Sequence, residues 1–154
     1  MVVIGGGQGF WGDSNDAAIH MVRNSNINYL ACDYLAELTL SIMARQKLKN
    51  PNAGYARDFL GMMKECGKEA YEKGIKVLTN AGGMNIKGLV DALAEQAAGQ
   101  GLKGMKIGYV LGDEISSEIP RLLAEGMTFD NIDDVGNFNE VRDKIFNANV
   151  DFGH

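Results

Sequence analysis

The chain has 154 residues, a net charge of −5, 45% hydrophobic residues and 23% charged residues, which is the composition of an ordinary globular protein. A chain of this length suits one domain that buries roughly 70% of the surface exposed by its extended form. The acidic balance, with no basic cluster beyond Arg45, Lys47 and Lys49, argues against a nucleic-acid partner.

The N-terminal apolar stretch is too short for a signal peptide or a membrane helix, and no basic segment precedes it. We therefore expect a cytoplasmic protein without a membrane partner. The two cysteines, Cys32 and Cys66, lack the spacing that is typical of a disulfide framework or a zinc site. Both are expected to be buried thiols.

Apolar runs alternate with segments of helical periodicity along most of the chain. The expected strands cover residues 2–4, 29–32, 75–79 and 106–111. The expected helices cover residues 14–23, 34–47, 57–73, 84–99 and 117–125. Strands that alternate with helices imply parallel βαβ units. The sequence therefore predicts an α/β fold, a three-layer sandwich with a mostly parallel sheet and helices on both faces.

The end of the chain differs from the rest. We predict a parallel α/β domain over residues 1–126 and a C-terminal extension over residues 127–154, which begins polar and acidic. One short helix is expected there, and three of its apolar side chains are expected to face inward: Val141, Ile145 and Phe146. Val150 and Phe152 resemble the start of a strand without a continuation, so the extension is expected to be truncated.

A glycine-rich turn follows the first expected strand. Residues 7–12 satisfy the pattern G-x-G-x-x-G, and Asp33 ends the second strand, where a ribose-binding acid lies in a dinucleotide site. However, the next helix is expected to start only after Asp13, whereas the dinucleotide motif opens directly into its helix. Two interpretations stay open: a nucleotide site, or a glycine turn that serves another ligand or only the chain reversal.

The loop after the third expected strand is the second candidate. The adjacent Gly82 and Gly83 allow backbone amides to converge on an anion, and Asn85 is placed to cap the following helix. A tight turn from strand to helix explains the same residues equally well.

Aspartates follow three of the expected turns or strands. Asp113 ends the fourth strand and is a candidate general base, metal ligand, hydroxyl acceptor or helix cap. If the strands are neighbours, Asp13, Asp33 and Asp113 converge on one divalent cation, which prefers carboxylate oxygens.

Ligands of open parallel sheets bind at the carboxyl ends of the strands, where these loops are expected to meet. The proposed catalytic groups are Asp33 and Asp113, which would handle a proton or a cation. The proposed ligand-binding residues are Gly7, Gly9, Asp13, Asn80, Gly82, Gly83 and Asn85. Neither a cofactor nor a specific metal is assigned.

Five segments, in order and in spacing, resemble the acyclic terpene utilisation protein A family: residues 9–13, 33–39, 54–59, 79–85 and 112–113. The resemblance implies a cytoplasmic protein of bacterial type, linked with the breakdown of branched acyclic terpenoids such as citronellol and geraniol through coenzyme A thioesters. The chain departs from the family at Ile86, where proline is usual, and family members are much longer.

We therefore expect an N-terminal α/β domain that binds a small carboxylate or acyl thioester at the carboxyl edge of its sheet and takes part in catabolism. A noncatalytic assembly domain is the first alternative, and it would need a companion subunit or a homo-oligomer to complete its sheet. A Rossmann-like nucleotide-binding module is the second alternative, and it requires the first helix to begin at the glycine loop.

Overall fold

The computed structural model describes residues 1–133 and 136–150. The chain forms two compact units, which we call the sheet unit (Met1–Tyr109) and the C-terminal unit (Val110–His154). Among the described residues, no helix is both long and apolar enough to cross a membrane.

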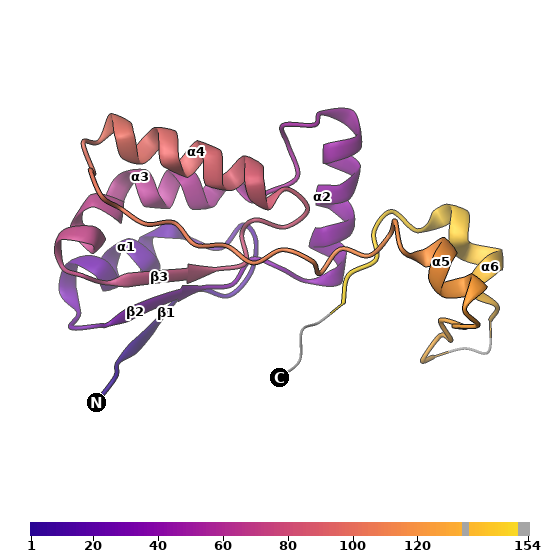
Figure 1. Cartoon of the computed structure of the whole chain (residues 1–154). Helices are drawn as coiled ribbons and strands as arrows, with labels where there is room; N and C mark the ends of the chain where they lie inside the picture. Colours follow the sequence, from indigo (N-terminus) through magenta and orange to yellow (C-terminus); the bar gives the residue numbers. More distant parts are fainter. Residues whose placement is uncertain (134–135, 151–154) are drawn as a thin grey trace. The chain divides into compact units, whose positions relative to one another are not determined.

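The sheet unit contains a parallel three-stranded sheet and four helices (Figure 1). Its strands lie in the order β1 (Ile4–Gln8), β2 (Tyr29–Cys32) and β3 (Lys76–Thr79). Its helices are α1 (Asn15–Asn24), α2 (Glu37–Lys49), α3 (Arg57–Glu72) and α4 (Ile86–Gly99). The predicted α/β class and the parallel sheet are confirmed. The first strand, however, covers Ile4–Gln8 instead of the predicted residues 2–4, so Gly7 belongs to the strand and not to the turn after it.

Local capping signals fix three helix ends where the sequence predicts them, the starts of α1 and α4 and the end of α3. The Ser14 hydroxyl accepts a hydrogen bond from the Asp16 amide at the start of α1, and the Asn85 side chain accepts one from the Gly88 amide at the start of α4. Gly74 adopts a φ of +69° directly after α3, a conformation that glycine reaches without steric cost.

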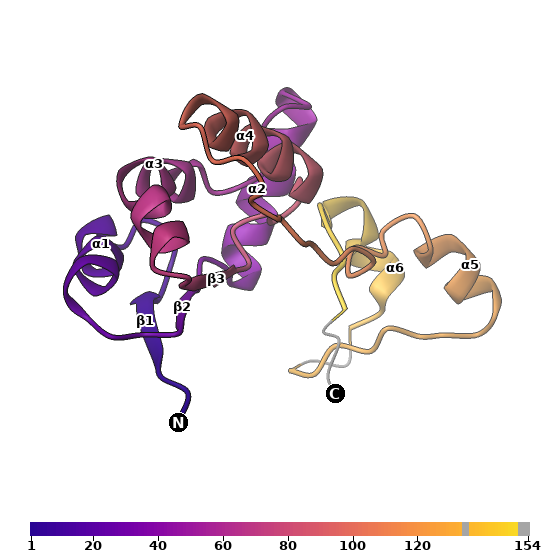
Figure 2. The same cartoon turned by 60° about the vertical axis from the view of Figure 1, so that its left-hand side comes forward.

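One face of the sheet is buried beneath helices. Figure 2 shows α1 and α3 on the same side of the sheet, where α1 contacts β1 and α3 contacts β3. A Cβ atom at Gly7 would lie 3.0 Å from the Ala18 Cβ, the Cys32 Sγ and the Leu30 Cδ1. Because these neighbours leave no room for a side chain, Gly7 allows α1 to pack closely on the strand.

The opposite side of the sheet, which we call the open face, carries six residues in two rows across the strands: Ile4, Tyr29 and Lys76, then Gly6, Ala31 and Leu78. Ile4 is 65% exposed and Leu78 is 54% exposed. The Lys76 ammonium lies 5.4 Å from the centre of the Tyr29 ring, which is a cation–π contact.

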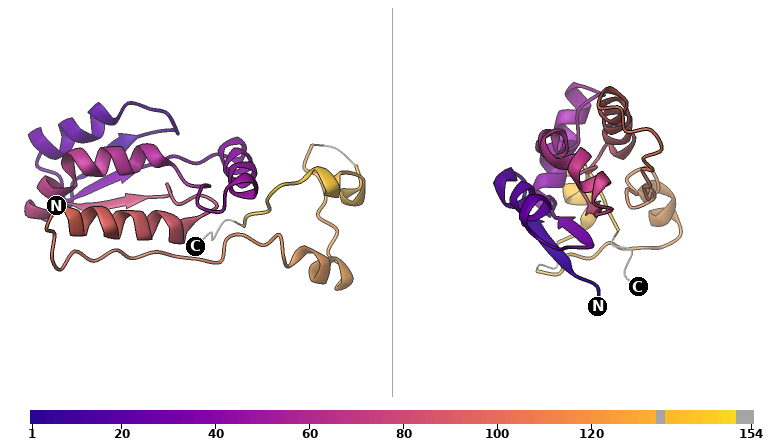
Figure 3. Two further views of the ribbon diagram at one scale, coloured as in Figure 1. Left: turned by 90° about the horizontal axis from the view of Figure 1, so that it is seen from above. Right: turned by 90° about the vertical axis from the view of Figure 1, so that its left-hand side faces the viewer.

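The predicted fourth strand is wrong, because residues 106–111 form no strand. Residues 102–109 instead run along the β3 side of the sheet without ladder hydrogen bonds (Figure 3). Gly108 interrupts the apolar run, and Tyr109 and Val110 are 50% and 77% exposed. The segment therefore lacks the burial that supports a strand of a parallel sheet.

The C-terminal unit consists of short elements: α5 (Ile119–Ala124), α6 (Phe138–Val141) and a 3₁₀ turn (Arg142–Lys144). An antiparallel bridge joins Glu114 to Asn149. Ile119 is the single buried hydrophobic residue among the described residues of this unit.

The apolar side chains predicted to face inward in the last helix are exposed instead. The exposed fractions of Val141, Ile145 and Phe146 are 45%, 40% and 42%. The prediction is wrong because α6 ends after one turn and the unit offers no core for these side chains to enter. Phe152, in the predicted strand start, lies outside the described residues.

Candidate functional site

The glycine-rich turn after β1 is closed by its own carboxylate. The Gly9 amide donates to the Asp13 Oδ2 at 3.1 Å, and the Ser14 amide donates to the Asp13 Oδ1 at 2.7 Å. Helix α1 begins only at Asn15, after the Ser14 cap. The turn does not open directly into a helix, so the condition for a nucleotide-binding module is not met.

The carboxyl ends of β2 and β3 are joined by Asn80. Its Nδ2 donates to the Asp33 Oδ1 at 2.7 Å, and its Oδ1 accepts from the Tyr34 amide at 2.8 Å. The Leu35 amide also donates to the Asp33 Oδ1. These bonds hold residues 33–35 in a non-helical conformation, which explains why α2 begins at Glu37 rather than at the predicted Tyr34. The structure thus brings Asp33 and Asn80 together.

A row of hydrogen-bonded polar groups lies beneath these strand ends, and it was not predicted from the sequence. The Gln8 Nε2 donates to the Asn15 Oδ1 at 2.6 Å, and the Asn15 Nδ2 donates to the Asp58 carbonyl at 3.3 Å. The row ends at the Gln8 Oε1 and the Tyr34 hydroxyl, two buried atoms that have no hydrogen bond beyond the interaction between these two side chains. A glutamine at the end of a buried strand was the one local signal that could have identified it.

Tyr34 is held as a neutral hydrogen-bond donor. Its side chain is fully buried, and its ring meets the Phe59 ring edge to face at 6.0 Å. Burial raises the pKa of the Tyr34 hydroxyl, and Cys32, Asp58 and Asp13 raise it further, whereas hydrogen bonding with the Gln8 side chain lowers it. The hydroxyl therefore keeps its proton at neutral pH.

The loop from Asn80 to Asn85 uses its polar groups within the fold. The Gly83 amide donates to the Asn80 carbonyl at 3.1 Å. The Asn85 Nδ2 donates to the carbonyls of Pro51 and Ala53, while its Oδ1 caps α4. Gly82 and Gly83 are buried. These contacts account for the loop as a packed turn, and an anion role for Gly82 and Gly83 stays a prediction.

Asp113 belongs to the C-terminal unit and has partners there. The Asn149 Nδ2 donates to the Asp113 Oδ2 at 2.8 Å, and the Val150 amide donates to the Asp113 carbonyl at 2.8 Å. The Asn147 Nδ2 donates to the Asn149 Oδ1. The sequence did not indicate the pairing of Asp113 with Asn149, because the two residues are distant along the chain.

The hypothesis of a cation held by Asp13, Asp33 and Asp113 gains no support. Over residues 1–133 and 136–150, no group of three or more His, Cys, Asp or Glu side chains could hold a metal ion. The carboxylate of Asp13 is committed to the Gly9 and Ser14 amides, and Asp113 lies in a different unit from the other two aspartates.

The two cysteines are free and buried, as the sequence predicts. Burial raises the pKa of the Cys32 thiol to about 12, with a further contribution from Cys66. Burial likewise raises the pKa of the Cys66 thiol. Both sulfurs are therefore protonated and unreactive at neutral pH.

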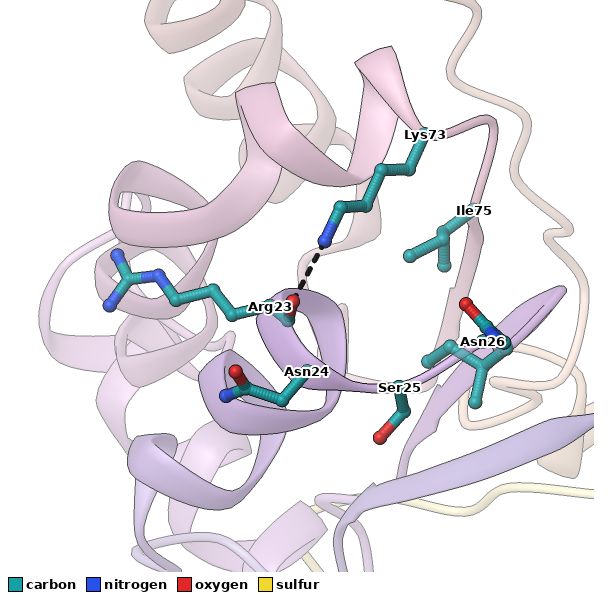
Figure 4. A pocket seen from close by; sticks show the side chains of 7 residues that line it. Arg23, Asn24, Ser25, Asn26, Lys73 and Ile75 are labelled. Carbon is teal, nitrogen blue, oxygen red and sulfur yellow. Dashed lines mark hydrogen bonds between the residues drawn. The ribbon is translucent and has the colours of Figure 1, made fainter.

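A cavity of about 360 Å³ lies at the other end of the sheet, where β2 and β3 begin (Figure 4). Its lining residues are Arg23, Asn24, Ser25, Asn26, Ile27, Lys73 and Ile75. The Lys73 Nζ lies 2.7 Å from the Val22 carbonyl, 3.0 Å from the Arg23 carbonyl and 2.8 Å from the Glu69 carboxylate. Arg23 also pairs with Glu69. Because both cations are occupied, this cavity offers little attraction to an anion.

Comparison with known proteins gives a family match over nearly the whole chain. The model of the family described as "Acyclic terpene utilisation family protein AtuA" matches residues 2–154. No curated protein matches the chain, and no solved structure does.

Proposed function

This chain belongs to the acyclic terpene utilisation family AtuA, and from that premise we propose that it binds a small carboxylate or acyl thioester at the carboxyl edge of its sheet. The binding would serve catabolism in the cytoplasm. Asp33 and Tyr34 from the end of β2, Gln8 from the end of β1 and Asn80 from the end of β3 form the proposed site.

The observation that carries the proposal is the pair of unpartnered polar atoms below the rim. Apart from the interaction between their own two side chains, the Gln8 Oε1 and the Tyr34 hydroxyl are buried without a hydrogen bond, and a buried polar group left unpaired costs about 1–3 kcal/mol. A ligand oxygen that accepts a hydrogen bond from the Tyr34 hydroxyl would remove part of this cost. Because both atoms are shielded from solvent, we expect binding to require local opening of the turn after β1.

The chemistry of the surrounding groups favours a carbonyl oxygen as the bound group. Tyr34 remains a protonated donor, since burial and the nearby Asp13 and Asp58 carboxylates raise its pKa. The Gly9 amide already donates to Asp13, so we propose Tyr34 in place of this amide as the donor. Asp33 is exposed and oriented by Asn80, so it is the first candidate to exchange a proton with the ligand. Asp113 belongs to the C-terminal unit and is not part of this proposed site, so its catalytic role stays a separate prediction.

Ligand titration of the full chain tests the proposal. We expect acetyl-coenzyme A or acetate to raise the melting temperature and to bind in calorimetry, whereas NAD and ATP leave both unchanged. Tyr34→Phe, which removes only the hydroxyl, should weaken binding about tenfold.

The matched control is Tyr109→Phe, because Tyr109 is 50% exposed and lies outside the proposed site. Its affinity should equal that of the unmodified chain. Equal affinity of Tyr34→Phe and Tyr109→Phe would remove Tyr34 from the site, and stabilisation by NAD or ATP alone would replace the proposal with nucleotide binding.

A further inference from the structure

Two aspartates lie close to the buried polar atoms of the proposed site. Asp13 belongs to the turn that follows Gln8, and its carboxylate accepts a hydrogen bond from the Gly9 amide at 3.1 Å. Asp58 lies in the first turn of α3. Its carbonyl accepts a hydrogen bond from the Asn15 side chain, which itself accepts one from the Gln8 Nε2. Both aspartates are thus linked to Gln8, one through the turn and the other through Asn15.

The carboxylates of these two aspartates act on the Tyr34 hydroxyl. Phe59, the neighbour of Asp58 in α3, packs its ring edge to face against the Tyr34 ring at 6.0 Å. Burial and Cys32 raise the pKa of the Tyr34 hydroxyl, and the charges of Asp58 and Asp13 raise it further. The hydroxyl that would donate to a ligand therefore lies in the field of two negative charges.

Neither Asp13 nor Asp58 forms an ion pair with a residue of the sheet unit. Lysine and arginine side chains of this unit pair with Glu69 and Glu72 instead, at the opposite end of α3 from Asp58. A ligand carboxylate at Tyr34 would bury its charge beside two like charges, which is costly. An uncharged carbonyl oxygen accepts the same hydrogen bond from Tyr34 without this cost.

We propose that the site selects an uncharged carbonyl group, as in a thioester, an ester or an amide, over a free carboxylate, and that Asp13 and Asp58 determine this specificity. The inference rests on the proposed function, since it concerns the same site, and it names the charge class of the ligand. It also separates two roles of Asp13. Closing the turn affects charged and uncharged ligands alike, whereas repulsion affects only the charged ones.

Acetamide and acetate measure the selectivity, because they are nearly equal in size and differ in charge. Titration of the ¹⁵N-labelled full chain with each probe, followed by NMR, gives the two affinities from the shifts of the Gly9 and Tyr34 amide signals. We expect acetamide to bind at least about tenfold more tightly than acetate.

Charge-removing variants identify the groups responsible. Asp13→Asn and Asp58→Asn keep the size of the side chain, and each should raise the affinity for acetate about tenfold while leaving the affinity for acetamide unchanged. The matched control is Asp16→Asn, which removes the same charge from an exposed residue of α1 outside the site and should leave both affinities unchanged.

The outcomes separate this inference from the proposed function. Equal affinity of the unmodified chain for acetamide and acetate overturns the inference and leaves the proposed function standing. So does an unchanged acetate affinity in both variants, or an equal rise for the two probes in Asp13→Asn, which would restrict Asp13 to closing the turn. If Asp13→Asn fails to fold, Asp58→Asn and the unmodified chain still decide. A chain that binds neither probe nor acetyl-coenzyme A overturns the proposed function and the inference with it.

Discussion

The two units of this molecule hold their shape by different means. The sheet unit packs a continuous core beneath one face of its sheet, including Leu30, Met43 and Met62, all fully buried. The C-terminal unit has Ile119 as its one buried hydrophobic residue among those described, and polar bonds such as Asn149 to Asp113 join its ends. Core burial therefore accounts for the stability of the sheet unit, while the C-terminal unit depends on local hydrogen bonds.

The largest expected effect follows from removing core volume in the sheet unit. Leu30→Ala deletes a fully buried side chain from β2 and should lower the free energy of unfolding by about 3 kcal/mol. Urea denaturation measures the change. Ile132→Ala in the C-terminal unit, where the side chain is 100% exposed, should leave the midpoint unchanged. Similar losses in both variants would contradict the contrast between the units.

The second-largest effect that we expect is a loss of stability of the sheet unit at alkaline pH. Burial raises the pKa of Cys32 from 9.0 to about 12, so the unfolded chain loses this proton at a lower pH than the folded chain does. Stability is therefore fully present below about pH 9 and is lost as the pH rises toward 12. Urea midpoints across this range measure the effect, and Cys32→Ala should flatten the slope. A slope that is unchanged in this variant would assign the effect to other groups.

A smaller effect is expected where a polar bond joins two strands. Asn80→Ala leaves the Tyr34 amide and the Asp33 carboxylate without their partner, which should cost about 2 kcal/mol. Asn139→Ala, at an exposed position of the C-terminal unit, serves as the control. Equal urea midpoints for the two variants would show that Asn80 does not hold the strand ends together.

The smallest effect is expected at the surface ion pairs of the C-terminal unit. Arg121 bonds to Glu118 at 3.0 Å and to Glu125 at 2.6 Å, but all three side chains are at least half exposed. Solvent screens such pairs, so Arg121→Gln should produce no measurable change in the urea midpoint. A clear loss of stability would mean that charge pairs, rather than hydrogen bonds such as that from Asn149 to Asp113, hold this unit.

Local signals in the sequence were sufficient for most helices and for β2 and β3, whereas β1 covers Ile4–Gln8 instead of the predicted residues 2–4. Ser14 caps α1, Asn85 caps α4 and Gly74 ends α3, as the residue types predicted. The prediction of a fourth strand at residues 106–111 was wrong. An apolar run becomes a strand only when a neighbouring strand pairs with it, and the sequence pattern, interrupted here by Gly108, does not show whether that happens. In the same way, a helix with inward side chains was predicted around Val141 without a core to receive them.

The part of the candidate site at the strand ends was predictable from the sequence, but the buried polar groups below it were not. Asp33 and Asn80 lie at strand ends, so their proximity follows from a parallel sheet. The unpartnered atoms of Gln8 and Tyr34, and the closure of the glycine turn by Asp13, depend on side-chain positions that no spacing encodes.

The sequence by itself determined where most helices begin and end and where β2 and β3 lie, because capping and periodicity involve residues within a few positions of each other. The tertiary structure alone decided how many strands pair, which face of the sheet is covered and which polar atoms lack partners. These outcomes depend on groups that folding brings together from distant positions, such as Asn80 and Asp33, and on how much surface each unit can bury.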